Sequence, residues 1–147
     1  MRLHKMNTDP YIRKAQFYET DQMGVVHHAN YIHWFEEARV DFLEKMGFPY
    51  EDVEARGITL AVLSVTAEYR APVLFGDTVR IFVKVTECVH SQMAIRYRVE
   101  DAASGESRTT GETRHYFHRK KDSRPVSLKK SIPDLFELFC ASAASDA

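Results

Sequence analysis

The sequence predicts an α+β fold, in which an antiparallel sheet carries one long helix packed on it. Two observations support this. One stretch in the first third of the chain has the 3.6-residue hydrophobic period of an amphipathic helix, and nearly everything after residue 57 alternates with a period of two. The resulting order of one strand, one long helix and four further strands is typical of a helix on an antiparallel sheet.

The long helix is expected from Tyr31 to Met46, with one face turned to a core. The apolar residues at helical spacing are Tyr31, Trp34, Phe35, Ala38, Phe42 and Met46. Asn30 or a residue just before it is suited to cap the start. Gly47, followed by Phe48-Pro49, supplies a left-handed cap and a stop.

The other elements follow from alternation and turn residues. A first strand is expected near Tyr11–Phe17, and a short helix over Tyr50–Ala55. The four later strands are expected over Thr59–Arg70, Thr78–Val89, Met93–Glu100 and Glu106–His118. A partly helical segment over Ser131–Ala141 is expected to cover a core edge or a neighbouring subunit.

Length and composition fit a single domain over residues 1–147. The chain has 147 residues, 44% of them hydrophobic and 12% aromatic, which suits one core. We expect this core within about residues 11–118, followed by a C-terminal extension over 119–147. The formal net charge of -1 gives no electrostatic reason to expect nucleic acid as a partner.

Cysteine usage and the lengths of apolar runs favour a cytoplasmic protein. Cys88 and Cys140 suggest neither a disulfide framework nor a cysteine zinc site. The segment Met1–Pro10 builds no apolar signal-peptide region, and no run approaches membrane-spanning length, so no membrane partner is expected.

The segment Tyr18–Tyr31 carries the strongest chemical signal. Asp21 lies seven residues before His28, with Gly24 between them. A short turn could therefore hold the carboxylate beside free backbone N–H groups at the start of the helix. A carboxylate next to oriented donors suggests acyl chemistry.

Two segments in order also show a family resemblance. These are Glu19–Tyr31, running into Trp34–Arg39, and the later Tyr69–Asp77. With the order of elements, they make roughly residues 11–118 resemble the hotdog-fold acyl-CoA thioesterases of the 4-hydroxybenzoyl-CoA thioesterase-like family. The likeness is greatest to the branch represented by the Tol-Pal-associated thioesterases.

The resemblance implies a sheet wrapped around a central helix and hydrolysis of an acyl-CoA thioester without a cofactor. The essential Asp of the branch maps onto Asp21, and its motif His onto His28. Relatives often have Tyr where this chain has Phe17, so a role for that hydroxyl cannot be carried over, although neighbouring Tyr18 offers a partial substitute. Active sites at the dimer interface are common in the family. Exposed sheet edges also favour assembly, so we expect a homodimer or homotetramer.

The residues allow this chemistry in two ways that the sequence leaves open. Asp21 could activate a water, or attack the thioester carbonyl and form an anhydride. Backbone N–H groups near His28 and Ala29 would stabilise the oxyanion, and the imidazole of His28 would position substrate or Asp21. Substrate is expected to contact Gly24, Val25, Ala29 and Tyr31.

Each residue also has a structural interpretation. Asp21 and Gly24 suit a turn, and Tyr31 suits a plain core. His27, His28 and His33 do not indicate a metal site, because the adjacent His27 and His28 should point apart and no carboxylate falls at a zinc-helix spacing.

Other hypotheses remain at this stage. Some hotdog thioesterases carry the catalytic carboxylate on the central helix, which keeps Glu37 as a second candidate. The basic run over residues 119–130 suits either a solvated surface or the phosphates of coenzyme A. A hotdog dehydratase and a non-catalytic acyl-thioester-binding module are the alternative functions. Acyl chain preference, and coenzyme A against acyl-carrier protein, lie beyond the sequence.

Overall fold

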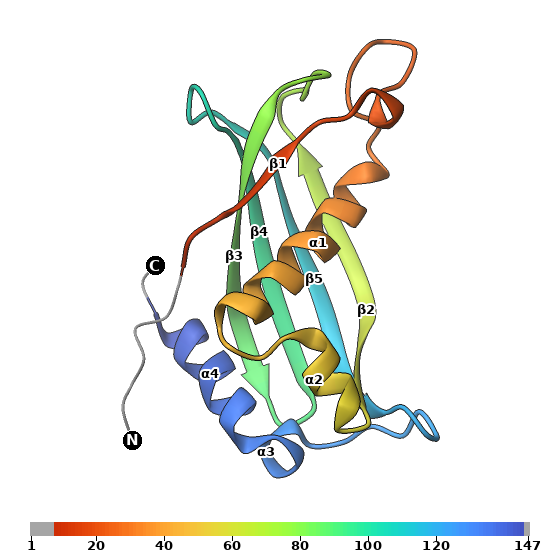
Figure 1. The fold of residues 1–147 in the computed structure, drawn as a ribbon, viewed down its shortest axis with the longest axis vertical. Helices are drawn as coiled ribbons and strands as arrows, with labels where there is room; N and C mark the ends of the chain where they lie inside the picture. The colour runs from red at the N-terminus through yellow and green to blue at the C-terminus, as the bar shows by residue number, and fades with distance from the viewer. Residues whose placement is uncertain (1–7, 146–147) are drawn as a thin grey trace.

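The structure is a computed structural model that describes residues 8–145. Residues 1–7, part of the segment expected to lack a signal peptide, and residues 146–147 lie outside the described part. In chain order the elements are β1 (Tyr11–Lys14), the 3-10 helix η1 (Phe17–Glu19), α1 (Asn30–Lys45), α2 (Tyr50–Ala55), β2 (Ile58–Tyr69), β3 (Thr78–Val89), β4 (Gln92–Asp101), β5 (Ser107–Arg119), α3 (Leu128–Ser131) and α4 (Pro133–Ala144) (Figure 1).

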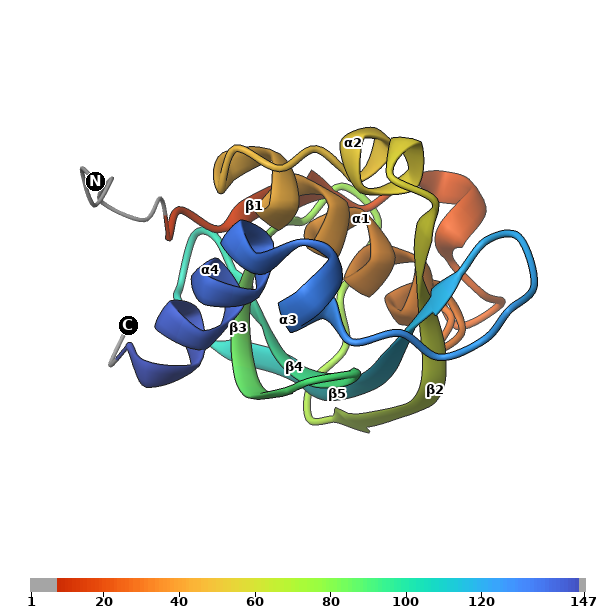
Figure 2. The ribbon, with the colours of Figure 1, turned by 90° about the horizontal axis from the view of Figure 1, so that it is seen from below.

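The five strands form one antiparallel sheet in the order β1-β3-β4-β5-β2. The sheet curves beneath α1, which lies along its concave side (Figures 1 and 2). This arrangement confirms the predicted α+β class. Among residues 8–145, no helix is both long and apolar enough to cross a membrane.

The alternating pattern of the strands places one face of the sheet in the core. Val79, Ile81 and Val85 of β3 are fully buried, and Ile81 lies opposite Val99 of β4. Burial of such apolar side chains is the main favourable contribution to folding.

Close packing between α1 and the sheet depends on a glycine. The ring of Phe35 stacks on Tyr97, with ring centroids 4.4 Å apart. A Cβ added to Gly111 of β5 would lie 2.5 Å from the Phe35 ring. The helix can therefore approach this closely only because residue 111 has no side chain.

The ends of α1 agree with the prediction to within a residue. Its N-cap position is Ala29, and no side chain caps the helix. The Asn30 amide instead donates to the carbonyl oxygen of Glu19, at 2.8 Å. Gly47 follows the helix with φ +85°, the left-handed conformation expected at this position.

The first strand is shorter than predicted. It ends at Lys14, and Phe17–Glu19 forms η1 instead. The cause is local, because the Gln16 N–H donates to the Glu19 carboxylate at 2.8 Å rather than to a neighbouring strand.

The C-terminal helix covers a core edge, one of the two roles expected for it. α4 packs beside β3 and buries Leu135 and Phe139. The ring of Phe139 stacks on Phe117 of β5, with centroids 6.3 Å apart.

Candidate active site

Asp21 lies in a tight loop between η1 and α1. Residues Thr20 and Val26 form an isolated β-bridge that closes the loop, and the Asp21 N–H donates to the Val25 carbonyl at 2.9 Å. Gly24 turns the chain with φ +78°, and its N–H donates to the Asp21 carbonyl at 3.0 Å. A left-handed residue is needed here, which favours glycine.

The Asp21 carboxylate is anchored through one oxygen. Its Oδ1 accepts the Met23 N–H at 2.8 Å and the Val25 N–H at 3.4 Å. Within residues 8–145, no group donates to Oδ2. Asp21 therefore does act as a turn residue. The turn contacts hold its carboxylate in place through Oδ1 and leave Oδ2 able to contact a water or a substrate.

The start of α1 brings one free donor beside this loop. The Ala29 N–H donates to His27 Nδ1 at 3.1 Å, whereas the N–H of His28 has no partner in the described part of the chain. The His27 and His28 rings stack with centroids 4.1 Å apart, so the expectation that they point apart is wrong.

A pocket of about 380 Å³ opens between the Asp21 loop and the end of β2. It is lined by Asp21, Val25, Val26, His28, Tyr31, Tyr69, Arg70, Ala71 and Pro72. The two walls are joined by main-chain contacts: the Val26 N–H donates to the Val73 carbonyl at 2.8 Å, and Val25 bridges Leu74. The two family-like segments of the sequence therefore meet at one site.

Four of the six predicted site residues line this pocket, namely Asp21, Val25, His28 and Tyr31. Gly24 and Ala29 do not line it. They shape the loop and the helix start, and both are exposed. Phe17 and Tyr18 also lie outside the lining, with 75% and 78% of their surface exposed.

Five lining residues were not predicted as site residues, namely Val26, Tyr69, Arg70, Ala71 and Pro72, and Tyr69 is the one that binds the main chain of His28. Its hydroxyl donates to the His28 carbonyl at 3.1 Å, and its ring lies 5.2 Å from that of Tyr31. The second family-like segment begins at this residue and could have identified it. Tyr31 itself is 3% exposed, and burial raises the pKa of its hydroxyl.

The second carboxylate candidate is placed differently. Glu37 accepts the Tyr11 hydroxyl at 2.9 Å and Arg13 Nε at 2.8 Å, and it is not among the residues that line the Asp21 pocket. The basic C-terminal run is also away from the pocket lining, with Arg119 paired to Asp122 and Lys120 to Glu54. Among residues 8–145, no group of three or more His, Cys, Asp or Glu side chains is arranged to hold a metal ion.

A curved antiparallel sheet around a central helix, with a carboxylate loop at one end, defines a hotdog-fold protein. The chain belongs to the thioesterase-like superfamily, whose model matches residues 15–136. By class it is a thioester hydrolase.

The chain is also similar to solved structures and to a curated relative. A DHNA-CoA thioesterase from Staphylococcus aureus is 30% identical, with a TM-score of 0.87 over 92% of this chain and 91% of that chain. A hypothetical protein from Thermus thermophilus is 37% identical, with a TM-score of 0.82 over 91% and 98%. The acyl-CoA thioester hydrolase YbgC of Escherichia coli O157:H7 is 29% identical over 89 residues, 60% of this chain and 66% of the relative.

Proposed function

We propose that this protein hydrolyses acyl-CoA thioesters to a carboxylic acid and coenzyme A, with Asp21 as the reacting carboxylate. The observation that carries the proposal is the pocket in which Asp21 and His28 lie together at the start of α1. The substrate class is supported by the names of the similar S. aureus and E. coli proteins, both of which act on coenzyme A thioesters.

Asp21 supplies the oxygen chemistry in either of two ways. Its free Oδ2 takes a proton from an attacking water, or itself attacks the carbonyl carbon to form an anhydride that water then cleaves. In both routes the electron pair of the breaking C–S bond leaves with sulfur, and the thiolate takes up a proton. The anchoring of Oδ1 by Met23 holds the carboxylate for this attack.

The negative oxygen of the tetrahedral species is stabilised by the His28 N–H. This group is without a partner in the described residues and lies where the dipole of a 16-residue helix is positive. The Ala29 N–H already donates to His27 Nδ1. It can act as a second donor to the oxyanion only if the His27 ring moves. Tyr69 donates to the His28 carbonyl and so orients the next peptide, which carries the Ala29 N–H.

The active unit is proposed to be a homodimer or a homotetramer. β2 is an edge strand of twelve residues, and its Val62 and Leu63 are about half exposed. Such an edge favours pairing with a second copy. Because Tyr69 ends the same strand, this pairing would place the partner beside the pocket. We also propose that the protein belongs to the Tol-Pal-associated branch and that it is cytoplasmic.

Asp21→Asn tests the mechanism. Asn keeps an oxygen for the Met23 N–H, so the loop should persist, while the reacting carboxylate is lost. We expect kcat for saturated acyl-CoA substrates to fall by about 100-fold or more, measured as thiol release, with KM little changed.

Asp77→Asn is the matched control. Asp77 is also a turn carboxylate that accepts a backbone N–H, that of Leu74 at 3.0 Å, but it does not line the pocket. Near-normal turnover by Asp21→Asn would refute the mechanism. Activity on 3-hydroxyacyl thioesters alone, without thiol release from saturated ones, would favour a dehydratase.

A further inference from the structure

Glu19 is a buried carboxylate two residues before Asp21. Only 2% of its surface is exposed. Burying a carboxylate is costly unless it is paired and hydrogen-bonded. Its partners therefore show what the chain gains by placing it there.

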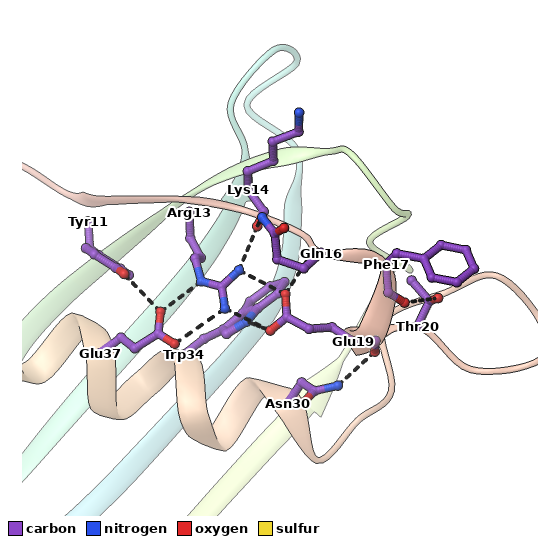
Figure 3. Close-up of polar contacts among 10 residues, drawn as sticks. All are labelled: Tyr11, Arg13, Lys14, Gln16, Phe17, Glu19, Thr20, Asn30, Trp34 and Glu37. Carbon is purple, nitrogen blue, oxygen red and sulfur yellow. Dashed lines mark hydrogen bonds and ion pairs between the residues drawn. The ribbon is translucent and has the colours of Figure 1, made fainter.

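Three residues satisfy the Glu19 side chain (Figure 3). Arg13 of β1 binds it bidentately, with Nη1–Oε1 and Nη2–Oε2 distances of 2.9 Å each. Trp34 Nε1 of α1 donates to Oε2 at 2.7 Å, and the Gln16 N–H donates to Oε1 at 2.8 Å. These bonds use the four acceptor positions of a carboxylate.

The main chain of Glu19 holds the far end of the Asp21 loop. Its carbonyl oxygen accepts the His27 N–H at 2.8 Å and the Asn30 amide at 2.8 Å. Glu19 thus directly precedes the loop, which starts at Thr20, and it binds His27, the residue that directly follows the loop. His27 is also the immediate neighbour of His28, whose N–H lies beside the pocket.

Arg13 extends the contact along α1. It lies over the Trp34 ring at 5.5 Å and donates through Nε to Glu37 at 2.8 Å. Glu19 and Glu37 therefore share one guanidinium. They differ in that Glu37 makes no contact with the loop, and 35% of its side chain is exposed, compared with 3% for Glu19.

We propose that Glu19 is a positioning residue, whose ion pair with Arg13 fixes the Asp21 carboxylate relative to the His28 N–H. The reaction needs the carboxylate near the carbonyl carbon and the N–H within hydrogen-bond distance of the carbonyl oxygen, and a misplacement of about 1 Å can reduce the rate about 100-fold. This inference rests on the role proposed for Asp21.

Glu19→Gln tests the inference, with Glu37→Gln as the matched control. A glutamine at position 19 would point an NH₂ group at the donors of Arg13 or Trp34 in a site closed to water. At position 37, water can relieve the same mismatch. At a temperature well below both unfolding midpoints, we expect Glu19→Gln to lower kcat about 10- to 100-fold with KM within about 3-fold. Glu37→Gln should keep kcat within about 2-fold.

Trp34 supplies a readout independent of activity, because it is the sole tryptophan of the sequence. Its indole N–H resonance in ¹H–¹⁵N spectra reports the Glu19 bond directly. The resonance should move upfield in Glu19→Gln and stay near its wild-type position in Glu37→Gln. If Glu19 only stabilised the fold, kcat would depend on stability alone. Glu19→Gln and Glu37→Gln would then have equal kcat whenever their unfolding midpoints are equal.

Asn30→Ala provides a second variant if Glu19→Gln does not fold. It removes one bond to the Glu19 carbonyl without touching the ion pair, and should lower kcat about 3- to 10-fold.

Three outcomes would overturn the inference, and they separate it from the proposed function. The positioning role alone would be refuted if Glu19→Gln had wild-type kcat while Asp21→Asn was inactive. If Glu19→Gln does not fold, wild-type kcat in Asn30→Ala would have the same meaning. Equal losses of kcat in Glu19→Gln and Glu37→Gln would assign the effect to the helix as a whole. Normal turnover by Asp21→Asn would remove the role of Asp21 and this inference with it.

Discussion

Two buried polar networks contact α1, and they differ in what else they hold. The first joins Arg13, Glu19 and Trp34, and through Glu19 it binds the main chain that leads into and out of the Asp21 loop. The second runs from Arg39 to the Tyr97 hydroxyl, then to Thr113 and His115, with bonds of 3.1, 2.7 and 2.7 Å.

The second network stays within α1, β4 and β5 and includes no residue of the pocket lining. Similar hydrogen bonds should therefore have different consequences. Substitutions in the Arg13 network should lower both kcat and the free energy of unfolding. Substitutions in the His115 network should lower the free energy of unfolding alone.

The largest effect is expected from Arg13→Ala. It leaves the buried Glu19 without its cation, which should lower the free energy of unfolding by about 3–5 kcal/mol. It should also lower kcat in the protein that remains folded. Urea unfolding and steady-state thiol release measure the two effects, with Lys14→Ala on the exposed side of β1 as control. A loss below about 1 kcal/mol would show that the network is not tightly coupled.

A smaller effect is expected from pH through His115. Burial, with the nearby Arg39 as a lesser cause, lowers the pKa of His115 from 6.5 to about 3. The unfolded chain therefore binds a proton below about pH 6.5 that the folded protein does not. Stability is lost as the pH falls from 6.5 towards 3, by up to about 2 kcal/mol between pH 6.5 and 5 from this group.

His115→Asn isolates this contribution. Urea unfolding at several pH values should show a shallower dependence between pH 6.5 and 5 in the variant than in the wild type. Equal slopes would mean that His115 is not the group that titrates on unfolding.

The smallest effect is expected from Tyr97→Phe. The ring keeps its stack on Phe35, and only the hydroxyl shared by Arg39 and Thr113 is removed. The free energy of unfolding should fall by about 1 kcal/mol, measured by urea unfolding, while kcat stays within about 2-fold. A loss of kcat near that of Glu19→Gln would erase the distinction between the two networks.

Local pattern predicted the elements well where one physical cause dominates. The period of α1 and the alternation of β3 reflect burial of a single face, so both were found to within a residue or two. The first strand was overextended because the Glu19 side chain takes the Gln16 N–H, a contact that hydrophobic period does not report.

The sequence predicted the part of the site that is built from neighbouring residues. Asp21, His28 and Tyr31 are close in sequence, and the turn between them is encoded by Gly24. Tyr69 lies about forty residues later and reaches His28 only because β2 ends beside the loop.

The sequence by itself determined the class of fold, the carboxylate loop before α1 and the resemblance to thioesterases, because each rests on neighbouring residues or on a regular period. Only the tertiary structure decided that Glu37 pairs with Arg13, that Tyr69 binds the His28 carbonyl, and that Glu19 joins both ends of the loop. These depend on which donors and acceptors meet when distant segments pack together. A buried carboxylate must find its partners in three dimensions, wherever the chain supplies them.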